Sequence, residues 1–224
     1  VEGQPGNMFD TTSYAVDDFE GGQPVVTLTN SGDASNFTVG KIVFLHTAEN
    51  GGYASGQELE RPFFEINRVA EIIGADIRLE KTIGADGVGC VLGIDGTGGL
   101  TDYEGDTSEA WADGSISHLS VSVADDNDSW HRLGCMFNCK IHDVEVHRSN
   151  IGFSANGVSH SHIWNITGEA HEKGFVLAYG SHDSTVSNFL VNQSQEDVSG
   201  SSNPWWHIEE GAKRCDAFNL KAII

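Results

Sequence analysis

Three polar stretches in the second half of the chain carry side chains that could do chemistry. They span residues 125–132, 147–150 and 169–173. Hydrolysis of a glycosidic bond needs two carboxylates at a set separation. β-Elimination from a uronate needs a base and a group that neutralises the sugar carboxylate. The stretches contain both sets of groups, and the candidate catalytic residues are Glu169, Glu172, His171, His147 and Arg148.

Aromatic side chains near these stretches are candidates for substrate binding, because a flat ring can stack on a sugar. Trp130 and His131 close the first stretch, and Trp205 and Trp206 follow a Ser- and Gly-rich loop over residues 192–204. The rival interpretation places the Trp205–Trp206 pair partly in the core.

Carboxylates in the first stretch suggest a metal as an alternative. Asp125, Asp126 and Asp128 supply the oxygen ligands that calcium prefers. However, the Gly expected at the sixth place of a calcium loop is Trp130 here. Calcium is therefore an open alternative, and the sequence points to no other cofactor.

The elements that must position these residues form a repeat from about Gly114 onward. Blocks of alternating apolar and polar residues begin at positions 116, 141, 163, 186 and 217, with spacings of 25, 22, 23 and 31 residues. Alternation of period two, recurring at the length of one solenoid coil, predicts an all-β chain with a right-handed parallel β-helix of about five coils. A second apolar segment follows each block, so the polar stretches are expected to be loops on one side of the helix.

The third position of each block is polar and recurs in every coil. We expect these short side chains to stack as a ladder that hydrogen-bonds the backbone of neighbouring coils at a bend, with a structural role. The residues are His118, Asp143, Asn165, Asn188 and Asn219.

The same register places Cys139 and Cys215 at equivalent corners three coils apart. Coils stack at roughly 4.8 Å, so about 14 Å would separate the two residues, too far for a disulfide. Free buried thiols are the expectation, and zinc is not expected.

The first half of the chain predicts a different organisation. Residues 1–35 are polar and are expected to form an N-terminal arm or linker with one strand at 24–29. Residues 36–84 are expected to form a small β-rich module, with a strand pair at 37–46 that turns at Gly40 and strands at 63–73 and 77–83. The β-helix is assigned to residues 85–224. It stops after the first strand segment of its fifth coil, so further chain or a partner subunit is expected to cover Ile224.

Charge excludes several classes of partner. The formal net charge is −21, from 33 acidic and 12 basic residues. That balance argues against binding nucleic acid, which needs clustered Lys and Arg, and against an anionic membrane surface. No apolar run reaches the length of a membrane span, and the first residues lack the basic and apolar pattern of a signal peptide, so none is expected within this sequence.

Two motifs in the first half carry a family resemblance. The stretch F-T-V-G-K-I-V-F-L at 37–45 and the stretch I-R-L-E-K-T-I at 77–83 resemble the leading region of pectate-lyase-like right-handed β-helix proteins. The blocks after Gly114 resemble the coils of the same superfamily. It includes secreted polysaccharide lyases and hydrolases and phage tailspikes, and the spikes are usually trimers.

This resemblance implies a polysaccharide partner and leaves three functions open. The first is a phage or virus tailspike-type receptor-binding protein, a homotrimer on the virion surface, which recognises a cell-surface polysaccharide with or without depolymerising it. The second is a secreted, extracellular polysaccharide lyase or glycoside hydrolase. The third is a structural or adhesive β-solenoid without an active site.

Overall fold

The computed structural model describes residues 12–47, 64–94, 100–101, 107–108, 111–122, 130–178, 181–193, 206–208 and 214–223. The chain is predominantly β and divides into two compact units, Val1–Ala110 and Trp111–Ile224. Within the described part, no helix is both long and apolar enough to cross a membrane.

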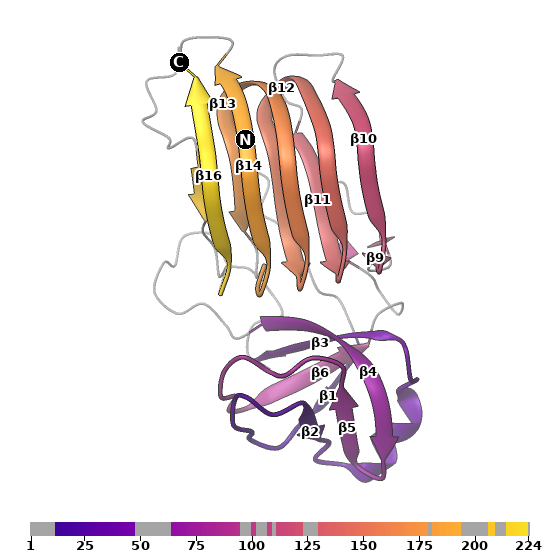
Figure 1. Ribbon diagram of the computed structural model, residues 1–224. Coiled ribbons are helices and arrows are strands. Elements are labelled where there is room, and N and C mark those ends of the chain that lie inside the picture. The colour runs from indigo at the N-terminus through magenta and orange to yellow at the C-terminus, as the bar shows by residue number, and fades with distance from the viewer. Residues whose placement is uncertain are drawn as a thin grey trace. The chain divides into compact units, whose positions relative to one another are not determined.

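The first unit is built around a six-stranded antiparallel sheet with the order β1-β6-β3-β4-β5-β2 (Figure 1). A 3-10 helix, η1 (Ser31–Asn36), begins after Asn30, whose side chain accepts a hydrogen bond from the Gly32 amide. A short hairpin of β7 (Leu100–Thr101) and β8 (Thr107–Ser108) stands apart from the sheet. The strands of the sheet are β1 (Thr12–Ala15), β2 (Val25–Thr27), β3 (Ile42–Thr47), β4 (Phe64–Ile73), β5 (Asp76–Leu79) and β6 (Cys90–Ile94).

The strands of this unit match the predicted segments in part. β4 and β5 lie at the predicted segments 63–73 and 77–83 and are joined at Gly74 with φ 63°, but β5 ends at Leu79 rather than at residue 83. The segment 37–46 holds β3 alone, because its first residues follow η1 and turn at Gly40, where φ is 88°. β2 lies within the predicted strand at 24–29. Residues 12–35 were otherwise expected to be an arm, yet β1 pairs with β6 and β2 with β5 as part of the sheet.

The second unit is a stack of parallel strands in two layers (Figure 1). One layer runs β10, β12, β13, β14, β16, and the other runs β9, β11, β12, β13, β15. β12 and β13 are long enough to take part in both layers. The bounds are β9 (Trp111–Ala112), β10 (Ser115–Ser122), β11 (Trp130–Phe137), β12 (Lys140–Ser159), β13 (His162–Ala178), β14 (Thr185–Gln193), β15 (Trp206–Ile208) and β16 (Asp216–Ile223).

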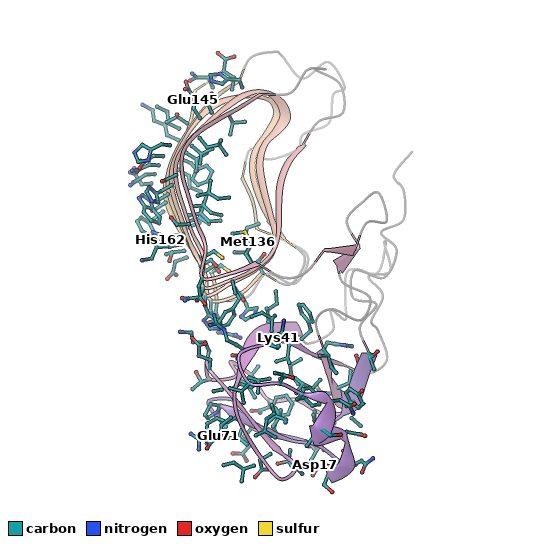
Figure 2. The ribbon with its side chains drawn as sticks, turned by 90° about the vertical axis from the view of Figure 1, so that its right-hand side faces the viewer. Asp17, Lys41, Glu71, Met136, Glu145 and His162 are labelled. Atoms are coloured by element: carbon teal, nitrogen blue, oxygen red, sulfur yellow. The ribbon has the colours of Figure 1, made fainter. Side chains whose placement is uncertain are left out.

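The register in the first layer is the one that the repeat predicts. Equivalent apolar residues face each other in sequence, because Ile116 pairs with Ile141, Ile141 with Ile163, Ile163 with Val186 and Val186 with Ala217. These inward side chains form the core together with Met136, Val158 and Leu177 of the second layer. Figure 2 shows Met136 between the layers and His162 on the outside.

Two of the predicted loops are wrong. Residues 147–150 lie inside β12 and residues 169–173 inside β13; of the stretch 125–132, only residues 130–132 are described, and they belong to β11. The strands pass from one layer to the other there, with register shifts between Val146 and Ser149 and between Ser149 and Ile151. Polar side chains suit both a loop and the outer side of a strand, so composition alone misassigned these stretches.

The cysteine prediction agrees with the register. Cys139 and Cys215 directly precede Lys140 and Asp216, which lie in one row of paired residues with His162 and Thr185 between them. Neither cysteine forms a disulfide; Cys139 is buried and Cys215 is partly exposed. Serines take the two positions between them: the Cys139 amide donates to Ser161 Oγ at 2.9 Å, and the Ser161 amide donates to Ser184 Oγ at 3.1 Å.

Candidate functional site

The outward side of the first layer, here called the outer face, presents a ladder of polar side chains. Asn165 Nδ2 donates to Asp143 Oδ1 at 3.0 Å, Asn188 to Asn165 Oδ1 at 3.1 Å, and Asn219 to Asn188 Oδ1 at 2.6 Å. His118 Nε2 lies 3.9 Å from Asp143 Oδ2. The predicted column is therefore real, although its bonds run between side chains.

Every residue of this ladder has a positive φ, between 55° and 56°. Such a residue bends the strand, so that Ile141 and Val144 both face inward although two residues separate them. Asp and Asn tolerate this left-handed conformation better than most residues. The ladder therefore fixes both the bend and the spacing of the outward side chains beside it.

Four outward side chains next to the ladder form what we call the four-residue block. Lys140 and His142 come from β12, and His162 and Trp164 come from β13; Lys140 pairs with His162 and His142 with Trp164. The His142 and Trp164 rings stack at 4.3 Å between centroids and 13° between planes. The His162 ring lies 4.4 Å from Trp164 at 38°. The block is an aromatic surface on a rigid sheet.

Some titratable groups on the outer face lie next to a group of opposite charge, and others do not. His142 Nδ1 lies 2.7 Å from Asp143 Oδ2. This hydrogen bond, with that from Asn165, lowers the pKa of Asp143 below its ordinary value. Burial and the neighbouring Lys140 charge lower the pKa of His162.

These groups match what a sugar needs from a protein. His142 already stacks on one face of the half-buried Trp164 ring, and the exposed part of that ring offers an apolar surface for the C–H side of a pyranose. The exposed amides of Asn165 and Asn188 offer donors and acceptors for hydroxyl groups. Because a parallel sheet holds all of them, little side-chain or loop entropy is lost on binding.

A second column of positive-φ residues lies at the bend between the layers, and the sequence reasoning missed it. Its members are Asp113, Asn138, His160, Asp183 and Arg214, with φ between 48° and 57°. Within it, Asn138 Nδ2 donates to Asp113 Oδ1 at 2.6 Å across 25 residues. Arg214 donates to both carboxylate oxygens of Asp183, at 2.8 and 2.6 Å.

This second bend also brings together three side chains of the metal-ligating kind. The ligand atoms of His160, His182 and Asp183 all lie within 4.8 Å of one another. Arg214 already occupies both oxygens of Asp183, and a bound cation would have to compete with that charge. The arrangement is better described as an ion-paired corner than as a metal site.

Two of the predicted catalytic residues have described side chains. His147 lies on β12 with Nε2 3.5 Å from Glu145 Oε2. Glu169 is exposed on β13 and pairs with Asn192 of β14. Both follow directly on the paired residues Val146 and Gly168, so the structure brings them to neighbouring strands.

Of the remaining predicted site residues, some have only their backbone described and the others lie outside the described residues. Backbone positions are described, without side chains, for Arg148 on β12, His171 and Glu172 on β13, Trp130 and His131 on β11, and Trp206 on β15. Trp205 and the calcium candidates Asp125, Asp126 and Asp128 lie outside the described residues.

Trp164 is the residue that the sequence reasoning missed. A usable signal was present: Trp164 is the second residue of its block, between the inward Ile163 and the ladder residue Asn165. Its neighbours Ile163 and Ile166 supply the inward side chains of this strand, so the core does not need a large aromatic ring at this position.

No family model and no curated protein matches the sequence. Solved structures do match. The tailspike protein gp49 of Pseudomonas phage LKA1 aligns with a TM-score of 0.55 at 11% identity, over 94% of this chain and 39% of that one. The tailspike gp61 of Pseudomonas phage phi297 aligns with a TM-score of 0.52 at 10% identity, over 84% of this chain and 36% of that one.

The chain thus spans less than two fifths of the length of these two tailspikes. At this level of identity the similarity concerns the fold. The resemblance expected from the sequence is confirmed to that extent: this chain has the fold of phage tailspike proteins.

Proposed function

We propose that this chain belongs to a tailspike-type receptor-binding protein of a phage or virus, and that its outer face binds a cell-surface polysaccharide. The observation that carries the proposal is the stack of Trp164 with His142 and His162 beside the Asn ladder. The fold shared with tailspikes supports it.

The finer architecture is part of the same proposal. The two layers belong to a right-handed parallel β-helix of about five coils, and the protein acts as a homotrimer on the virion surface or outside the cell. Sedimentation equilibrium tests the assembly: three times the chain mass is expected, and a monomer at working concentration contradicts it.

Binding is tested with a panel of purified bacterial capsular polysaccharides and the variant Trp164→Ala. Loss of the stacking surface should weaken binding about tenfold or more. Thr167→Ala, an exposed change on the same strand, is the matched control and should bind as the wild type. Equal affinity of both variants would reject the site.

Cleavage of the polysaccharide is a second candidate function, favoured by one observation. Glu145, His147 and Glu169 place two carboxylates and an imidazole on neighbouring strands of the outer face. If these groups perform acid–base chemistry, Glu169→Gln should lower the release of new chain ends about a hundredfold or more. Glu71→Gln, an exposed change in the first unit, is the control.

A further inference from the structure

We propose that the four-residue block selects a sugar residue that carries an anionic group. The inference rests on the proposed function, because it names the class of glycan that the same face binds. Its starting point is a local charge opposite in sign to that of the whole chain, whose formal net charge is −21.

Lys140 and His162 are directly paired on neighbouring strands, and both are exposed. Among the described residues neither has a carboxylate partner, and Thr185, next in the row on β14, is uncharged. The other described histidines of this face do lie near carboxylates: His118 at 3.9 Å and His142 at 2.7 Å from Asp143, and His147 at 3.5 Å from Glu145.

Trp164 determines where a bound sugar would lie. A pyranose stacked on its ring is next to the His162 imidazole, whose centroid is 4.4 Å from that of Trp164. Lys140 lies across from His162 on β12. An anionic substituent on this sugar could therefore accept charge-assisted hydrogen bonds from both groups, which are about twice as strong as neutral ones.

The electrostatics agree with an anionic ligand. Burial and the Lys140 charge lower the pKa of His162, so both favour the neutral imidazole in the absence of ligand. A bound anion would offset the repulsion from Lys140 and favour the imidazolium. Binding should then take up a proton and strengthen as the pH falls toward the lowered pKa of His162 in the free protein. Around His162 the facing groups are Lys140 on β12, Thr185 on β14 and Trp164 on its own strand.

Carboxylates and phosphates share this chemistry, so the experiment separates them. Each capsular polysaccharide of the panel is measured in three forms: native, carboxyl-reduced and dephosphorylated with hydrofluoric acid. The native acidic polymer should bind about tenfold more tightly than the form that has lost its anionic group. Which treatment causes the loss identifies the group as carboxylate or phosphate.

The variants assign the effect to the block. Lys140→Gln should lower affinity about tenfold for the native polymer and leave the neutralised polymer unchanged. Lys221→Gln, an exposed lysine on β16 of the same face, is the matched control and should change neither. Trp164→Ala should weaken the binding of both forms.

Each contrary result has its own meaning. Equal binding of native and neutralised polymers, with Trp164→Ala still weak, overturns the anionic selectivity and leaves the proposed function standing. An equal loss of affinity in Lys140→Gln and Lys221→Gln also overturns the anionic selectivity of the block, because any lysine on the outer face would then attract the polymer equally. A panel in which nothing binds, or in which Trp164→Ala binds normally, overturns the proposed function itself.

Discussion

Arg214 forms a bidentate ion pair with Asp183, 31 residues earlier in the chain, with Nε 2.8 Å from Oδ1 and Nη2 2.6 Å from Oδ2. Both residues have positive φ, 50° and 48°. His182 Nδ1 lies 2.9 Å from Asp183 Oδ2 as well, and the His182 side chain is fully buried. The bend before β14 and the bend before β16 are therefore joined by a partly buried ion pair.

Asp183→Asn should lower the free energy of unfolding by about 2 kcal/mol, because it removes charge-assisted hydrogen bonds and leaves Arg214 without its counter-ion. Chemical denaturation measures this. Asp216→Asn, an exposed carboxylate at the start of β16, should change stability little. Similar losses in the two variants would contradict the role of the ion pair.

The pH dependence of stability tests the same corner. Burial raises the pKa of Asp183, but hydrogen bonds from His182 and Arg214 and their positive charges outweigh it, so the pKa lies well below its ordinary value. A depressed folded pKa stabilises the protein fully above the unfolded pKa of about 3.9, and this contribution is lost as the pH falls toward the folded pKa.

The stability advantage of the wild type over Asp183→Asn should therefore be full at pH 6 and smaller at pH 3. Urea unfolding of both proteins across this range measures it. An advantage that stays constant, or grows, as the pH falls would be evidence against the linkage.

The Asn ladder can be separated into hydrogen bonding and conformation. Asn188→Ala loses the bonds to Asn165 and Asn219 and forces Ala into φ near 56°. A loss of about 2 kcal/mol is expected from these two effects. Asn188→Gly loses the same bonds without the strain, so it should be less destabilising. Thermal unfolding of the pair checks the order, and a more stable Ala variant would refute it.

Gly168 sits where β13 turns from the first layer, with φ 150°. A Cβ atom there would collide with the backbone carbonyl of Val146 on the neighbouring strand. Gly168→Ala should therefore cost about 2–3 kcal/mol, since backbone atoms cannot yield as side chains do. Thr167→Ala, one residue earlier and exposed, should change the free energy of unfolding little. An equal loss of stability in both variants would contradict the collision with Val146 as the cause.

The stacking register could be predicted because two signals agree in it. Apolar alternation places Ile116, Ile141 and Ile163 inward, and the polar third position gives His118, Asp143 and Asn165 the same spacing. The sequence pattern predicted a bend at these polar residues, but it did not predict their left-handed backbone conformation.

The second column, by contrast, could not be found by residue type. Asp113, Asn138, His160, Asp183 and Arg214 share no chemistry, only a positive φ. Their spacing repeats that of the first column, so a search by register rather than by side chain would have found them.

The candidate site was predicted only in part, because polarity was interpreted as a loop. His147 and Glu169 do reach one face on neighbouring strands. However, the aromatic surface depends on Trp164, an outward residue of a strand. A search for alternating apolar residues does not identify such a residue as part of a binding site.

The central claim is that polysaccharide covers Trp164 on the outer face. Hydroxyl-radical footprinting measures side-chain exposure residue by residue, with and without a bound polysaccharide. The account predicts protection of Trp164, His142 and His162, and no change at Ile73, a 58% exposed residue of the first unit. Full binding with Trp164 and both histidines as reactive as before would contradict it.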